Sequence, residues 1–250
     1  MCARVGVLLL PHMPIDISDY AGKKFVFCLP GSYYSGKFLS NLVGLTTYLV
    51  ASDIQVMMAQ VSSSCIHRLR NTCGGGNPAN GLLQVPFATD GVDYDYVMWI
   101  DSDVVFTRDD FLRLLEVDKP VVTGWYYQND GNPACGFTDK KLQRYGKRKK
   151  PNHPIYDPDH IYTLRYDSNI TEKTEPYPID WVGMGWMLIQ RGVMESIQYP
   201  WFAPRTVRVS EDLIDSLSED ISFQINLREA GYDIWMHPGI RVGHEKTRVI

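Results

Sequence analysis

The sequence predicts an α/β protein with a mostly parallel central sheet flanked by helices, and two stretches carry that prediction. Residues 24–60 are predicted to form a strand, a helix and a second strand. This order and length are those of a βαβ unit, in which the two strands run parallel. Residues Tyr96–Ile100 form a short apolar run with aromatic and β-branched members. Such a run is typical of a strand that is buried on both faces of a parallel sheet. At 250 residues, the chain is long enough for one such domain with a large core.

The first half of the chain alternates between predicted strands and predicted helices. Pro30-Gly31 closes the first strand, and Ser35 precedes a segment in which apolar residues recur at helical spacing, as expected of an N-cap. Ser62–Ser64 can cap a second helix that carries Ile66 and Leu69 inward. The predicted elements are a strand at 24–29, a helix at 35–50, a strand at 53–60, a helix within 62–72 and a strand at 96–100.

The second half continues the pattern around a long interruption. Thr107 can cap a helix, and Ser218 can cap another that stops at Gly231. Strands are predicted at 119–127, in the apolar run 179–189 and at 232–237. We expect an irregular N-terminal arm at 1–22 and a single domain at 23–250, with a long insertion at about 128–178 that is rich in Pro, Asp, Asn and Tyr.

Composition narrows the class of protein. The apolar fraction of 44% and the charged fraction of 22% are ordinary for a soluble globular domain. A formal charge of −4 argues against general nucleic-acid binding. The apolar run Val5–Leu10 is too short to span a membrane. The five cysteines form no C-x-x-C pair and indicate reduced thiols, so we expect a cytoplasmic protein without a zinc site.

The strand Tyr96–Ile100 ends abruptly in Asp101-Ser102-Asp103. Ligands of open α/β sheets bind outside the carboxyl ends of the strands, which is where these carboxylates would lie. Two adjacent carboxylates repel each other, and a divalent cation with a preference for oxygen, Mg²⁺ or Mn²⁺, would relieve that repulsion. Such a metal commonly takes further ligands from substrate phosphates. The motif therefore indicates a metal–diphosphate site; the alternative is a strand followed by a polar turn.

Two later stretches also carry candidate functional residues. Gly183 and Gly185 lie inside an apolar, strand-like run, which indicates close approach of another backbone or of a ligand; a bulge is the alternative. Glu219 and Asp220 lie in the first turn of the helix that begins at Ser218, where the helix dipole favours carboxylates in any case.

In their joint order, these features resemble glycosyltransferases of the GT-A fold, whose sheet is Rossmann-like. The resemblance covers about residues 23–247, and is nearest to small glycosyltransferases encoded by large algal DNA viruses, of the chlorovirus type, and by phages. The matching features are a strand ending at Pro30-Gly31, the segment Ser64–Asn71, DSD at 101–103, GMGW at 183–186, SED at 218–220 and GYDIWMHPGIRVGHEK at 231–246.

The resemblance implies a role for each matching residue at the donor site. Asp103 and His244 would bind Mn²⁺ or Mg²⁺ directly, while Asp101 would bind the metal through water, or the ribose. Lys246 would contact the diphosphate, and Arg70 would reach the nucleotide base or phosphate. The remaining donor-site and pocket residues would be Pro30, Gly31, Ser102, Gly183, Gly185 and Trp186.

The resemblance also implies the reaction, in which a hexose-type sugar moves from a nucleoside diphosphate, with UDP favoured, to a hydroxyl of a glycan or glycoprotein. Asp220 would be the general base of an inverting reaction, which we favour slightly over retention, with Glu219 as the second candidate. Two alternatives remain open from the sequence. One is a metal-dependent nucleotidyltransferase, and the other is a non-catalytic module that binds a nucleotide sugar or glycan.

Overall fold

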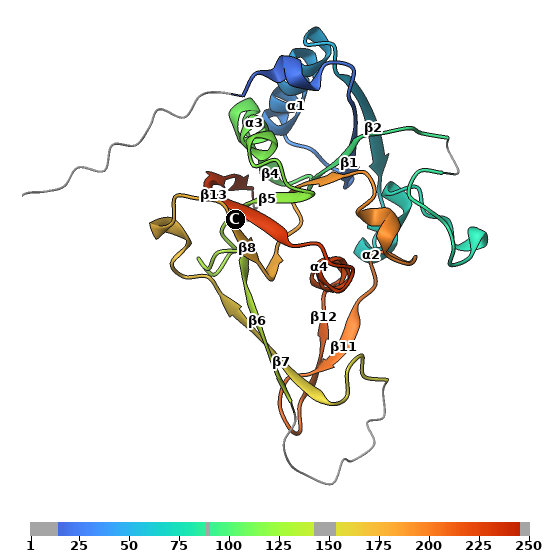
Figure 1. Cartoon of the computed structure of the whole chain (residues 1–250), viewed down its shortest axis with the longest axis vertical. Helices are drawn as coiled ribbons and strands as arrows, with labels where there is room; N and C mark the ends of the chain where they lie inside the picture. Colours follow the sequence, from blue (N-terminus) through green and yellow to red (C-terminus); the bar gives the residue numbers. More distant parts are fainter. Residues whose placement is uncertain (1–14, 89–90, 143–153, 246–250) are drawn as a thin grey trace, which may run out of the picture.

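The computed structural model describes residues 15–88, 91–142 and 154–245. Its centre is a seven-stranded sheet in the order β2-β1-β3-β10-β5-β13-β8 (Figure 1). Five strands run in one direction, and only β10 and β8 are antiparallel to their neighbours, so the predicted α/β class with a mostly parallel sheet is confirmed. The strands are β1 (Lys24–Pro30), β2 (Gln55–Val61), β3 (Tyr96–Ile100), β5 (Val121–Trp125), β8 (Tyr177–Ile179), β10 (Trp186–Gln190) and β13 (Ile234–Arg241).

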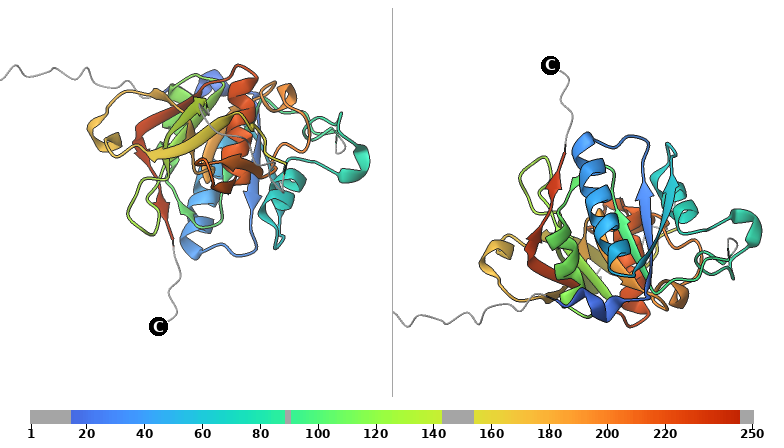
Figure 2. Two further views of the ribbon diagram at one scale, coloured as in Figure 1. Left: turned by 90° about the horizontal axis from the view of Figure 1, so that it is seen from below. Right: turned by 90° about the horizontal axis from the view of Figure 1, so that it is seen from above.

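Helices cover both faces of this sheet (Figure 2). In β1, Phe25 and Phe27 pack on one face, while Val26 and Cys28 pack on the other, because successive side chains of a strand point to opposite faces. The first face is covered by α1 and α3, and the second by α2 and α4. The helices are α1 (Gly36–Ala51), α2 (Ile66–Cys73), α3 (Arg108–Glu116) and α4 (Glu219–Glu229), and the 3₁₀ helices are η1 (Ile17–Tyr20), η2 (Pro78–Asn80), η3 (Ile170–Glu172) and η4 (Met194–Ser196).

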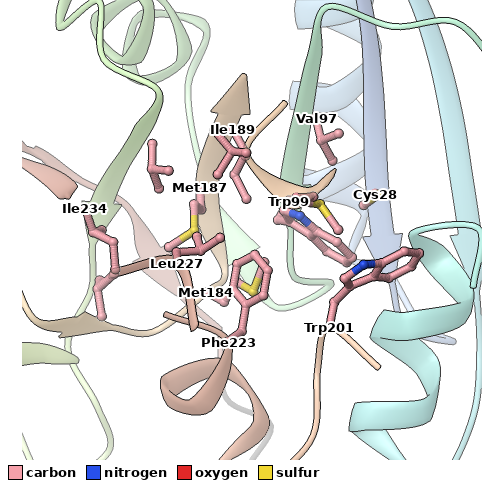
Figure 3. Close-up of a cluster of buried hydrophobic side chains, with 14 of the residues drawn as sticks. Cys28, Val97, Trp99, Met184, Met187, Ile189, Trp201, Phe223, Leu227 and Ile234 are labelled. Carbon is pink, nitrogen blue, oxygen red and sulfur yellow. The ribbon is translucent and has the colours of Figure 1, made fainter. Parts of the chain in front are cut away.

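The core on the α4 side is rich in aromatic residues and sulfur, as Figure 3 shows. Trp99 of β3 packs edge to face against Phe202, with ring centroids 5.1 Å apart, and Phe202 stacks on Phe223 of α4 at 4.4 Å. Each buried aromatic side chain removes a large apolar area from water, which is the main stabilising term for the fold. This packing fixes the start of α4 relative to the end of β3.

Local capping explains where two of the helices begin. The Ser35 hydroxyl oxygen accepts a hydrogen bond of 3.0 Å from the Phe38 backbone N–H, which caps α1 as predicted. Thr107 and Asp110 form a reciprocal capping box at the start of α3.

The start of α2 differs from the prediction. Its N-cap is Cys65, which makes no side-chain capping bond, so the serines before it do not cap the helix. Leu69 is buried as expected, but Ile66 is exposed because α2 is only a short helix lying on one edge of the sheet.

The apolar run 179–189 forms three strands instead of one. β8 ends at Ile179, Trp181 and Val182 form β9 (Trp181–Val182) in a smaller sheet, and β10 begins at Trp186. The break has a physical cause in α4. The fully buried side-chain amide of Gln224 accepts from the Val182 N–H at 2.8 Å and donates to the Val182 carbonyl at 2.6 Å, which holds β9 on the helix.

The predicted insertion at about 128–178 contains strands of its own. β6 (Cys135–Leu142) and β7 (His160–Tyr166) are antiparallel and join β9 in a three-stranded sheet. Next to β7 lies a ribbon of β11 (Arg205–Arg208) and β12 (Ile214–Leu217), and both pairs extend away from the central sheet below α4 in Figure 1. A small core that includes Tyr162, Val207, Leu217 and Ile225 joins them to α4.

The described part of the N-terminal arm packs against the domain. The Tyr20 ring lies 6.5 Å from Phe25 and 6.0 Å from Tyr96, and its hydroxyl donates to the Leu115 carbonyl at 3.3 Å. Burial raises the pKa of Tyr20 to about 12. Within the residues that the structure describes, no helix is long and apolar enough to cross a membrane.

Candidate functional site

The first component of the site is Asp101, directly after β3. Its backbone N–H donates to the Gly185 carbonyl at 3.0 Å, which ties the end of β3 to the start of β10. Its Oδ2 accepts a hydrogen bond of 2.9 Å from Nη2 of Arg70. Its Oδ1 is buried and has no hydrogen-bond partner among the described residues. One oxygen of this carboxylate is therefore held in place, while the other retains its capacity to accept.

Arg70 lies behind Asp101 and is only 3% exposed. Its Nε contacts Oε1 of the buried Glu219 at 3.3 Å, and its guanidinium lies 5.8 Å from the ring centroid of Trp99. Burial alone would lower the pKa of Arg70, but the carboxylates of Asp101, Asp220 and Glu219 together raise that pKa above its usual range. Arg70 bridges two carboxylates inside the protein, and its contact with the nucleotide stays a prediction.

The second component joins Asp103 to the far end of the chain. Two short strands, β4 (Val104–Val105) and β14 (Gly243–His244), pair antiparallel and place His244 opposite Val104. As a result, Nε2 of His244 lies 3.0 Å from Oδ2 of Asp103, although 141 positions separate the two residues. The Glu245 N–H also donates to the Asp103 carbonyl at 2.7 Å. The sequence predicted that these two side chains share one site, and the structure brings them together.

The orientation of the His244 ring suits a metal ligand. Its Nδ1 lies 3.2 Å from the carbonyl oxygen of Tyr127, which can only accept a hydrogen bond. This contact places the ring proton on Nδ1, so in the neutral imidazole the Nε2 lone pair is directed at the Asp103 carboxylate. Two acceptors 3.0 Å apart require a proton or a cation between them. A backbone carbonyl behind a histidine is also the usual support of a metal-binding ring.

Few side chains at this site could bind a metal ion. Among the described residues, no group of three or more His, Cys, Asp or Glu side chains is arranged to hold a metal ion. Asp101 is oriented by Arg70, while Asp103 and His244 contact each other. A cation here would have two side-chain ligands, and its other ligands would come from water or from a substrate.

Gly31 allows the loop after β1 to pack against this site. Gly31 has φ +151, and a Cβ on it would lie 2.5 Å from the Ser102 hydroxyl oxygen. Its N–H donates to the Val61 carbonyl at 3.0 Å, while Pro30 is buried at the end of β1. The loop after β1 and the acidic turn after β3 therefore lie at the same edge of the sheet, as the parallel register of the two strands requires.

Gly183 and Gly185 allow Tyr126 to enter the site. A Cβ on Gly183 would overlap the Tyr126 hydroxyl, and a Cβ on Gly185 would lie 3.1 Å from the Tyr126 ring and 3.3 Å from Oδ2 of Asp101. The two glycines thus permit the close approach of a side chain, that of Tyr126, and not of another backbone segment. Burial, together with the charges of Asp101 and Asp220, raises the pKa of Tyr126 well above its usual range.

Tyr126 is a site residue that sequence reasoning missed. The sequence feature that could have identified Tyr126 is the cluster of glycine and aromatic residues at the end of the strand predicted at 119–127. Trp186, by contrast, is fully buried and stacks on Phe106 with ring centroids 4.6 Å apart. Its ring packs in the core, and its role in shaping the sugar pocket stays a prediction.

The third component is the first turn of α4. Ser218 is the N-cap residue but makes no side-chain capping bond; its hydroxyl donates to Oδ1 of Asp220 instead. The same oxygen accepts from the Ile221 N–H at 2.8 Å. Asp220 is partly exposed and close enough to influence the pKa of Arg70, whereas Glu219 is buried against Arg70. Of the two candidate bases, only Asp220 has access to solvent.

No family model matches this chain, and no curated protein matches its sequence. Several solved structures resemble it at low identity. A197 from STIV is 15% identical with a TM-score of 0.47, and the alignment covers 91% of this chain and 96% of that chain.

GalNAc-T7, solved with UDP, GalNAc and Mn²⁺, is 10% identical with a TM-score of 0.41; the alignment covers 89% of this chain and 43% of that chain. A mycobacterial protein is 11% identical with a TM-score of 0.44, and the alignment covers 96% of this chain and 74% of that chain. Because these TM-scores lie below 0.5, any assignment of function rests on the residues of this chain.

One predicted site residue cannot be placed. Lys246 lies outside the described residues, as does most of the basic run that begins at Lys140. Lys140 itself pairs with Asp157 at 2.7 Å on the β6–β7 sheet.

Proposed function

We propose that the protein is a metal-dependent glycosyltransferase that moves a hexose-type sugar from a nucleoside diphosphate, with UDP favoured, to a hydroxyl of a glycan or glycoprotein. The observation that carries the proposal is the 3.0 Å contact between Asp103 and His244, at the carboxyl end of β3 and beside Asp101. Ligand sites of open α/β sheets lie at this end of the strands.

Asp103 and His244 would hold Mn²⁺ or Mg²⁺. When bound, the metal would supply positive charge that stabilises the diphosphate as it leaves the sugar. Two side-chain ligands suit this role, because a metal that also binds substrate phosphates needs few ligands from the protein. Lys246, predicted to contact the same diphosphate, would add to this charge.

The donor would lie along the acidic turn. The Asp101 side chain is held by Arg70 and is 22% exposed, so this carboxylate would accept from a ribose hydroxyl or a metal-bound water. Gly31 and Ser102 form the adjoining wall from the β1 loop, and Gly183 and Gly185 leave the opposite side open to Tyr126. These residues bind and orient the nucleotide sugar, and they leave the chemistry at the anomeric carbon to other groups.

Asp220 would accept the proton of the attacking hydroxyl. Its position in the first turn of α4 favours the ionised carboxylate, and the Ser218 hydroxyl orients one of its oxygens. A base on the acceptor side supports an inverting reaction, which we favour over retention. Glu219 is a positioning residue in this account, since it is buried against Arg70.

The experiment is a scan of nucleotide sugars for hydrolysis with Mn²⁺, with Mg²⁺ and with EDTA. We expect release of nucleoside diphosphate from at least one sugar nucleotide with metal and none with EDTA. Asp103→Asn should abolish this release, while Asp109→Asn, on an exposed side chain of α3, should leave it unchanged. Metal-independent release would contradict the proposal. Release of pyrophosphate from a nucleoside triphosphate and a sugar phosphate would identify a nucleotidyltransferase, and binding without turnover would identify a binding module.

A further inference from the structure

A cavity is lined by residues at the start of α4, on β7 and on the β11–β12 ribbon. Figure 1 shows where these elements lie. The volume of the cavity is about 420 Å³, within the range of roughly 300–1,000 Å³ typical of small-molecule sites. Its walls come from three separate parts of the chain. The apolar lining residues are Tyr162 and Leu164 of β7, Val209 after β11, Leu217 of β12 and Ile221 of α4.

The cavity also has polar lining residues, one of which contacts the candidate base. These residues are Thr163, Asp215, Ser216 and Ser218. The Ser218 hydroxyl donates a hydrogen bond to Oδ1 of Asp220, and Ile221, which lines the apolar part, follows Asp220 directly in the chain. A ligand in the cavity that extends past Ser218 would therefore present its next group to the Asp220 carboxylate.

The charge of the lining restricts the ligand. Among the described residues that line the cavity, Asp215 is the charged one, and there is no Lys, Arg or His. An anionic ligand would meet a carboxylate with no compensating cation, which is unfavourable. Aliphatic walls, in turn, select for apolar groups, because they remove apolar surface from water. The lining therefore disfavours an anion and fits a ligand with an apolar body and a polar group.

We propose that this cavity binds the acceptor, and that the acceptor is a neutral hydroxyl compound with an aliphatic or aromatic group next to the reacting hydroxyl. This inference rests on the proposed glycosyltransferase function and adds the acceptor class to it. In the transfer, the acceptor oxygen bonds to the anomeric carbon. The bond from that carbon to the diphosphate oxygen breaks with its electron pair, and the acceptor proton moves to the Asp220 carboxylate.

The test compares three acceptors that differ only in the aglycone: methyl, octyl and p-nitrophenyl glucoside. With a sugar nucleotide that the enzyme hydrolyses, kcat/KM for the octyl or the p-nitrophenyl compound should exceed that for the methyl compound at least about tenfold. One methylene in an apolar pocket already changes kcat/KM by about 10–200-fold. Preference for octyl would indicate a lipid-linked acceptor, and preference for p-nitrophenyl an aromatic one.

Two leucines provide matched variants. Leu164 lines the cavity and is 36% exposed, so Leu164→Gln is compatible with folding. Leu213 is 58% exposed in the turn between β11 and β12 and does not line the cavity. Leu164→Gln should reduce the preference for the apolar aglycone by about tenfold, and Leu213→Gln should retain it. Thermal unfolding of both variants checks that the fold is intact.

Calorimetry measures the binding of p-nitrophenyl glucoside to the wild type and to both variants. This measurement tests the cavity as a binding site independently of the proposed glycosyltransferase activity. If no sugar nucleotide is turned over, the proposed function fails, while binding that Leu164→Gln weakens and Leu213→Gln retains would still support the cavity as the site for this class of ligand. Equal use of all three glucosides, an unchanged preference in Leu164→Gln, or no binding to the wild type would each overturn the inference.

Discussion

Replacing Arg70 by alanine tests how the two acidic parts of the site are held together. The side chain is buried, and it bonds to Asp101 at 2.9 Å and to Glu219 at 3.3 Å. Its removal leaves two carboxylates without their cation, and breaking a buried ion pair in this way costs about 3–5 kcal/mol. For a chain of this size, each kcal/mol lowers Tm by about 2–4 °C, so we expect a loss of roughly 6–20 °C.

Arg70→Lys refines the test, because a lysine keeps the charge but lacks the planar fork that bonds two carboxylates at once. We expect an intermediate Tm and weaker binding of the nucleoside diphosphate, since Asp101 loses its fixed orientation. Arg68→Ala is the matched control, as Arg68 is exposed on the same helix. The assay is thermal unfolding followed by calorimetry with UDP. An Arg70→Ala protein as stable as Arg68→Ala would refute the reasoning.

Three further predictions concern single residues. Asp220→Asn should lower turnover by about 10²–10⁴-fold while UDP affinity stays within about threefold, since it removes a proton acceptor and no donor contact; steady-state kinetics and calorimetry measure both. Gly183→Ala should cost about 1–3 kcal/mol in chemical denaturation because its Cβ overlaps Tyr126, whereas Gly44→Ala, in open space on α1, should stabilise by up to about 1 kcal/mol. Asp157 is subject to burial, which raises its pKa, but bonds from neighbouring side chains outweigh this and lower its pKa to about 2. Its contribution to stability is therefore present above about pH 4 and lost as the pH falls toward 2, so a variant with asparagine at this position should show a shallower loss of stability across that window.

Much of the fold follows from local sequence signals. Strand periodicity and apolar content located β1, β2 and β3, because buried parallel strands have near-continuous apolar sequences. The caps at Ser35 and Thr107 located two helices for an equally local reason. The acidic turn at Asp101 could also be placed at the ligand-binding edge, since the carboxyl ends of parallel strands share that edge.

The parts that could not be predicted depend on contacts between distant segments. The buried position of Arg70 could not be predicted because its partners, Asp101 and Glu219, lie 31 and 149 positions away. The apolar run 179–189 looked like one strand because nothing local shows that Gln224 holds Val182 on α4. In both cases a buried polar side chain requires partners, and those partners are defined only by the tertiary structure.

The proximity of Asp103 and His244 was predicted, but not from local sequence signals. Neither residue carries a local signal for the other, and their pairing was implied only by the resemblance to GT-A glycosyltransferases. The structure supplies the cause, which is the short pairing of β4 with β14 that places His244 opposite Val104. Tyr126, in contrast, enters the site through two glycines whose partner could not be identified from the sequence.

The most direct test of the central claim is calorimetric titration of UDP into the wild type and His244→Ala, each with Mn²⁺ and with EDTA. His67→Ala, on an exposed histidine of α2, is the control. If Asp103 and His244 hold one ion that also binds the diphosphate, the wild type and His67→Ala should bind UDP at least about tenfold more tightly with Mn²⁺, a difference of about 1.4 kcal/mol. His244→Ala should lose most of that gain. Equal affinity for UDP with Mn²⁺ and with EDTA in the wild type would contradict the account.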